Sequence, residues 1–137
     1  MIGALLAATL IAIATLHLIW GLGISWPITD EARLAKSVVG ALGITRMPPR
    51  WASLLVAAAL MVAAVLILST GGYLDLRLPD WVVRYAIYTM IGVFGLRGLV
   101  SYLPAWRRRV EPLFDGLNTR LYGPLCLLIA AGAWTQL

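Results

Sequence analysis

The chain has 137 residues, of which 61% are hydrophobic and 12% are charged, and its formal net charge at pH 7 is +5. A soluble domain carries roughly 25% charged residues, so a chain with this composition and a mean hydropathy of +0.89 has too few polar side chains to cover a surface in water. The composition therefore excludes an ordinary soluble globular domain and indicates an integral membrane protein.

Four apolar segments follow one another along the chain, and each is predicted to form a membrane-spanning helix. A bilayer core about 30 Å thick needs roughly 20 helical residues, and the backbone of a lipid-facing segment must satisfy its hydrogen bonds internally. The predicted spans cover about residues 2–23, 51–70, 81–103 and 121–137. The predicted fold class is all-α, an integral membrane four-helix bundle in which residues 1–137 form a single domain.

The segment DEARLAKSVVGALG, residues 30–43, lies between the first and second spans and predicts a short amphipathic interfacial helix. Thr29 is the expected N-cap, and the two acidic residues after it suit the positive end of the helix dipole. Leu34 and Val38 share one helical face, which suits a helix lying at the membrane surface. Two interpretations stay open, a simple connection between spans and a lid over a site in the bundle.

The basic residues fall in the loops, and their distribution predicts the orientation of the chain. The second loop carries only Arg77, beside Asp75 and Asp80, whereas the other two loops carry four basic residues each: Arg33, Lys36, Arg46 and Arg50 in the first, and Arg107, Arg108, Arg109 and Arg120 in the third. Because basic loops stay cytoplasmic, we expect the first and third loops in the cytoplasm and both termini outside, in a multi-pass protein of the cell inner (plasma) membrane. The positive charge thus predicts the lipid bilayer as partner, and no nucleic acid.

Polar residues inside or beside the apolar segments form the candidate site. His17 in the first span and Arg97 in the third lie at a similar distance from the predicted cytoplasmic boundary. A charge in the bilayer core costs a few kcal/mol by insertion scales, so Arg97 is expected to face the bundle, meet an acceptor or reach water. Asp115 is the acidic residue best placed to pair with it, and His17 is available to join by hydrogen bonding. The candidate ligand-pocket residues are His17, Trp20, Arg97, Ser101, Asp115, Asn118 and Tyr122.

Simpler interpretations of the two deepest polar residues also stay open. Arg97 can extend its long side chain to the cytoplasmic interface, with its stem in the apolar layer. His17 can donate or accept a hydrogen bond at a backbone carbonyl or amide of a neighbouring helix.

Motifs for cofactor chemistry are missing from the sequence. There is no glycine-rich phosphate loop of the P-loop or dinucleotide type. One histidine and one cysteine, Cys126, do not give the spacing of a zinc site, so we predict no metal and no cofactor. A Ser–His–Asp hydrolase has its residue types present, but the nucleophile elbow motif is absent.

Three blocks of the sequence resemble a bacterial family of small four-helix membrane proteins, the domain of unknown function 3995 family: LHLIWGLG at residues 16–23, LRG at 96–98 and FDGLNTRLYGPLCLLIA at 114–130. The resemblance covers nearly the whole chain and is most specific in the final block. It implies the fold and a membrane location, and no established activity. The chain departs from the family pattern at Asn118, where an aspartate is expected, and at Gly123, where serine is common.

The favoured function is the binding of an amphipathic or lipid-like small molecule, with its tail in the bundle and its polar head at Arg97 on the cytoplasmic side. One alternative is a membrane enzyme of lipid or isoprenoid isomerase or cyclase type, with His17 or Asp115 in proton transfer. Another is a transporter or channel subunit in which Arg97 lines an anion path, and this would need a homo-oligomer. A fourth is an accessory subunit whose partner supplies the activity.

Overall fold

The computed structural model describes residues 1–137 as an all-helical protein without strands. Helices α1 (Ile2–Gly21), α3 (Arg50–Thr70) and α4 (Asp80–Val100) are each long and apolar enough to cross a membrane. Their bounds lie close to those of the first three predicted spans, because an uninterrupted apolar run of this length is a local property of the sequence.

The fourth long helical segment is a composite one and begins well before the predicted span. It consists of α6 (Pro112–Leu117), the π-helical turn η1 (Asn118–Tyr122) and α7 (Gly123–Trp134), which follow one another without a break. The segment predicted as residues 121–137 is therefore only its second half, and α7 alone has 12 residues. Pro124 does not mark a helix start, because the wider turn η1 accommodates its missing N–H group inside the helical path.

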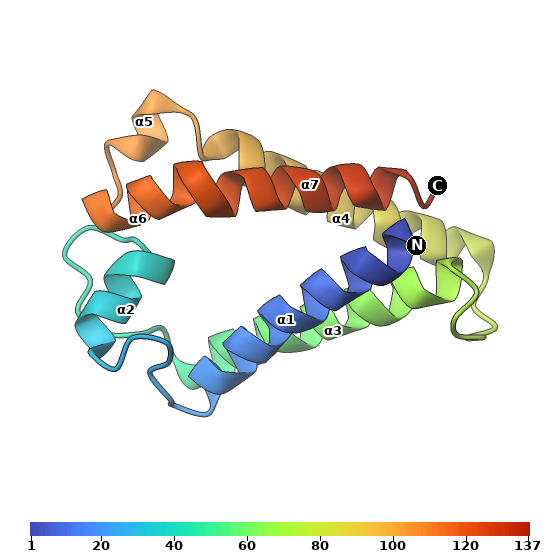
Figure 1. Ribbon diagram of the computed structural model, residues 1–137, viewed down its shortest axis with the longest axis horizontal. Helices are drawn as coiled ribbons and strands as arrows, with labels where there is room; N and C mark the ends of the chain where they lie inside the picture. Colours follow the sequence, from blue (N-terminus) through green and yellow to red (C-terminus); the bar gives the residue numbers. More distant parts are fainter.

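The long helices form two antiparallel pairs, α1 with α3 and α4 with α7 (Figure 1). The pairs meet near the chain termini and diverge toward the opposite end, where α2 (Glu31–Val38) lies between them. The buried apolar core follows this arrangement, since all of its residues except Ala14 lie in the halves of the four long helices near the termini. It consists of Leu6, Ala7, Leu10 and Ala14 of α1, Leu60, Ala64 and Ile67 of α3, Ile87 and Met90 of α4, and Ile129 and Ala133 of α7.

The predicted helix in the first loop is confirmed as α2, but its N-cap residue and its buried face differ from the predicted ones. Asp30, rather than the expected Thr29, is the N-cap, and its carboxylate accepts hydrogen bonds from the amides of Ala32 at 3.0 Å and Arg33 at 3.4 Å. The helix ends at Val38, close to Gly40 with a positive φ of 78°. Its fully buried residues are Leu34, Ala35 and Ser37, so the helix packs against protein on a face that includes a serine.

The two basic loops meet at the α2 end of the molecule. Ala41 forms an isolated antiparallel bridge with Val110, and the amide of Glu111 donates to the carbonyl of Gly40 at 2.8 Å. The carboxylate of Glu111 in turn accepts from the amide of Gly43 at 2.7 Å. The short helix α5 (Pro104–Arg107) reverses the chain before this contact, so α2, α5 and α6 gather at one end (Figure 1).

Candidate functional site

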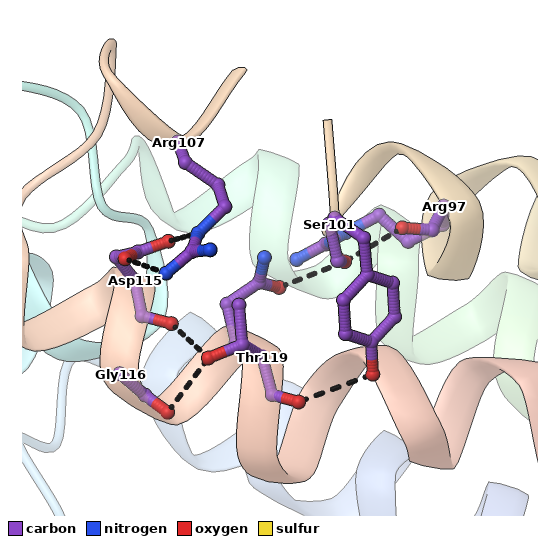
Figure 2. A network of polar contacts seen from close by, with 8 residues as sticks. Arg97, Ser101, Arg107, Asp115, Gly116 and Thr119 are labelled. Atoms are coloured by element: carbon purple, nitrogen blue, oxygen red, sulfur yellow. Dashed lines mark hydrogen bonds and ion pairs between the residues drawn. The ribbon is translucent and has the colours of Figure 1, made fainter. Parts of the chain in front are cut away.

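Arg97 projects from the last turn of α4 into a hydrogen-bonded chain with two buried residues (Figure 2). Its Nη1 donates to the hydroxyl oxygen of Ser101 at 2.8 Å. That hydroxyl lies 2.9 Å from the carbonyl oxygen of Arg97 and 3.2 Å from Oδ1 of Asn118, so its single proton serves one of these acceptors. Ser101 and Asn118 are both fully buried. These hydrogen bonds therefore link α4 to the π-turn η1.

An aromatic pair extends this network toward α2. The guanidinium carbon of Arg97 lies 5.7 Å from the ring centroid of Phe114, a distance at which a cation is attracted to the ring face. The ring of Phe114 is 5.9 Å from that of Tyr122, and the Tyr122 hydroxyl donates to the carbonyl of Ser37 in α2 at 3.1 Å. We use the name Arg97 cluster for the five residues Arg97, Ser101, Phe114, Asn118 and Tyr122.

Two glycines bring α4 and η1 close enough for these contacts. A Cβ atom on Gly123 would lie 2.9 Å from the carbonyl oxygen of Asn118 and 3.1 Å from Cβ of Ser101. A Cβ atom on Gly98 would lie 2.6 Å from Leu127 and 3.1 Å from the carbonyl oxygen of Gly123. Side chains at these positions would push the helices apart, so the small residues are what allows Asn118 to reach Ser101.

Asp115 does not pair with Arg97, and the expectation that it would is wrong. Its carboxylate is held by Arg107, with Nε 2.9 Å from Oδ1 and Nη2 3.0 Å from Oδ2 (Figure 2). The reversal of the chain at α5 brings Arg107 over α6 near the surface, where an ion pair needs less desolvation than one made at the depth of Arg97. The hydrogen bond from Arg107 holds the pKa of Asp115 below its ordinary value.

Arg97 consequently has no acidic partner. The chain forms two ion pairs, one between Arg107 and Asp115 and one between Arg77 and Asp75. Arg97 is only part-buried, and its contacts are the Ser101 hydroxyl and the face of Phe114. Its positive charge is therefore not neutralised within the chain.

His17 and Trp20 form a separate polar group on α1. His17 Nδ1 lies 2.9 Å from the carbonyl oxygen of Ile13 in its own helix, and its ring meets that of Trp20 edge-on at 4.9 Å. The Trp20 indole donates to the carbonyl of Trp26 at 2.7 Å. No hydrogen bond, ion pair or ring contact joins this group to Arg97. A pocket shared by His17 and Arg97 stays a prediction.

The candidate residues thus divide into three groups. Arg97, Ser101 and Asn118 are in direct contact, and Tyr122 joins them through Phe114, which sequence reasoning missed. The sequence could have indicated Phe114, because it lies about one helical turn before Asn118. Asp115 belongs to the pair with Arg107, and His17 and Trp20 form the third group.

One surface hollow lies away from all of these residues. It has a volume of about 510 Å³ at the end where α3 joins α4, and its lining includes Thr70, Asp80, Arg84 and Gln136. None of the seven candidate residues lines it. The Arg97 cluster is a packed polar cluster with one partly exposed cation.

A comparison with known protein families assigns the chain to one of them. The model of a family described as "protein of unknown function (DUF3995)" matches residues 10–133, so the chain belongs to this family, as its sequence blocks predict. No curated protein and no solved structure gives a significant match.

Proposed function

We propose that this DUF3995 member is a four-span membrane protein that binds an amphipathic, lipid-like small molecule through Arg97 on the cytoplasmic side. Helices α1, α3 and α4 supply three spans on the basis of length and apolar composition. The part of the composite segment formed by η1 and α7 supplies the fourth. In this arrangement α2, α5 and the first turns of α6 lie in the cytoplasmic interfacial layer.

One observation carries the proposal, the unneutralised guanidinium in the last turn of a mainly apolar helix. A charged side chain inside a membrane protein faces a partner, water or a functional cavity, because hydrocarbon does not solvate it. Of the two acidic groups that follow Arg97 in sequence, Asp115 is paired with Arg107 and Glu111 accepts from the amide of Gly43. The attraction to Phe114 contributes about 0.5–2 kcal/mol, less than the several kcal/mol that desolvating an ion costs. A ligand with a polar head supplies the missing interaction.

The surroundings of Arg97 suit the tail of such a ligand. Leu96 and Leu99 flank it on α4 and are exposed at 66% and 60% of their surface. On α7, Leu128 is 69% exposed. These side chains give the α4–α7 pair an exposed apolar surface, so a ligand with its head at Arg97 can place its tail along the helices or in the adjoining lipid.

The enzymatic and transport alternatives have weaker support. Acid–base chemistry needs a titratable group within reach of the reacting atoms. Asp115 is engaged with Arg107, and His17 contacts a carbonyl of its own helix. A transport path lined by Arg97 would require further polar residues between the helices, and Ser53 is the one polar side chain among the buried residues of α1, α3, α4 and α7.

The test is to compare what co-purifies with wild-type protein and with Arg97→Leu in mild detergent, using mass spectrometry of extracted small molecules. Wild-type protein is expected to retain a discrete amphiphile, and Arg97→Leu to lose it while remaining folded, because removing an unpaired charge relieves desolvation. Arg84→Leu is the matched control, since Arg84 is on the same helix at the other end. Equal retention by Arg97→Leu would contradict the proposal.

A further inference from the structure

We propose that the head of the ligand is an oxyanion, a carboxylate or a phosphate, bound directly by Arg97 with Asn118 as the second donor of the site. This inference rests on the proposed function and narrows its ligand to one chemical class. It rests on an excess of hydrogen-bond donors over free acceptors in the Arg97 cluster.

The Arg97 cluster has donors to spare. A guanidinium carries five N–H groups and no acceptor, and Arg97 makes one hydrogen bond to a side chain, to Ser101. The hydroxyl of Ser101 also lies within hydrogen-bond distance of two other oxygens, and the Tyr122 hydroxyl is occupied with the carbonyl of Ser37. The carboxylate oxygens of Asp115 are taken by Arg107. An incoming group must therefore bring acceptors.

Asn118 gives a second and independent sign of a missing acceptor. Its side chain is fully buried, with Oδ1 directed to the Ser101 hydroxyl. Its Nδ2 has no hydrogen-bond partner, and it is the only buried side-chain nitrogen or oxygen in the chain in this condition. Buried polar groups in proteins are almost always paired. The unpaired amide is one hydroxyl away from the guanidinium, so the two spare donors belong to one network on two helices.

The charge of the cluster selects the ligand class among the acceptors. A neutral head, such as an alcohol or a ketone, accepts hydrogen bonds but leaves the charge of Arg97 in place. A quaternary ammonium head brings a like charge and no acceptor. A carboxylate or phosphate neutralises the charge and offers two oxygens to the planar fork of the guanidinium.

The experiment compares amphiphiles with equal tails and different heads by titration calorimetry in maltoside micelles at neutral pH. Palmitate and palmitoyl lysophosphatidate are expected to bind at least about tenfold more tightly than hexadecanol, the gain typical of a charge-assisted contact. Inorganic phosphate and acetate distinguish the sources. If they displace palmitate, the site recognises the free anion, and if they do not, it recognises the headgroup of a lipid.

Variants separate this inference from the proposed function. Arg97→Gln is expected to bind palmitate and hexadecanol alike, because it keeps hydrogen bonding without the charge. Asn118→Asp places a carboxylate in the network and is expected to weaken palmitate binding. Arg120→Gln removes an exposed cation of η1 and is expected to change nothing. If wild-type protein binds hexadecanol as tightly as palmitate, the oxyanion inference is overturned. If no amphiphile binds, the proposed function fails as well.

Discussion

Arg107 and Arg97 are two guanidinium groups with different surroundings, and the difference decides which of them can meet a ligand. Arg107 has 48% of its side chain exposed and makes a bidentate pair with Asp115. Exposed pairs of this kind add little to stability, because water and salt screen them. The pair nevertheless occupies the Asp115 carboxylate, and Arg97 is left without an acidic partner.

The pKa of Asp115 is expected to rise toward its ordinary value of 3.8 when Arg107 is replaced by Ala. The hydrogen bond from Arg107 is the main cause of the lowered pKa, and the charge of Arg107 acts in the same direction. A lowered carboxyl pKa stabilises the folded state above the unfolded pKa, and this stabilisation is lost as the pH falls through the lowered value. Carboxyl NMR titration in micelles measures the change. Arg108→Ala, at the exposed neighbouring position, should leave the pKa unchanged, and an unaltered pKa in Arg107→Ala would contradict the assignment.

At the scale of the element, the π-turn η1 accommodates Pro124, which has no N–H group to donate. The amide of Gly123 bonds to the carbonyl of Asn118, five residues earlier. The next such bond would run from residue 124 to Thr119, but proline has no N–H to donate. The Tyr102 hydroxyl takes its place and donates to the Thr119 carbonyl at 3.1 Å (Figure 2). The irregular turn is thus stabilised from another element while it holds Asn118 against Ser101.

A double-mutant cycle tests whether the Tyr102 hydroxyl replaces the missing N–H group of Pro124 as the donor to the Thr119 carbonyl. Tyr102→Phe is expected to lower the free energy of unfolding by about 0.5–1 kcal/mol, the lower part of the usual range for a hydrogen bond, because Tyr102 is 44% exposed. In a Pro124→Ala background the loss should be smaller, since the new N–H group can serve Thr119. Unfolding by detergent titration measures both, and Tyr88→Phe, at an exposed tyrosine of α4, is the control. Equal losses in the two backgrounds would argue against the coupling.

These elements show which parts of the fold follow from sequence and which do not. The bounds of α1, α3 and α4 were predictable because length and hydropathy are local properties. The composite fourth segment was not, since Pro124 suggests a helix start unless a side chain from another element compensates for it. For the same reason the partner of Asp115 was not predictable from the sequence, because the reversal of the chain at α5 decides that Arg107 reaches it.

At the scale of the whole molecule, the apolar core and the polar contacts of the Arg97 cluster lie toward opposite ends. The core lies where the two helix pairs meet, near the termini. The pairs diverge toward α2, and there the contacts are specific ones: Gly40 against the ring of Phe114, and Ser37 with Tyr122. A side chain at Gly40 would overlap that ring. This end lacks a four-helix core, so it can change its packing around a ligand at a smaller loss of buried apolar area.

The proposed orientation is tested by labelling single cysteines with a membrane-impermeant maleimide in a Cys126→Ser background. Asp75→Cys, in the α3–α4 loop, and Thr135→Cys, near the C-terminus, lie at one end of the molecule, and Thr45→Cys lies in the basic loop at the other, all at exposed positions. In right-side-out membrane vesicles the first two are expected to react and Thr45→Cys is not. Inverted vesicles should reverse the pattern. The opposite pattern would place the Arg97 cluster on the outer side, and reaction of all three in both preparations would contradict membrane spanning. The expected orientation follows from the two basic loops. Their eight cations favour the cytoplasmic side, because moving them across the membrane is unfavourable.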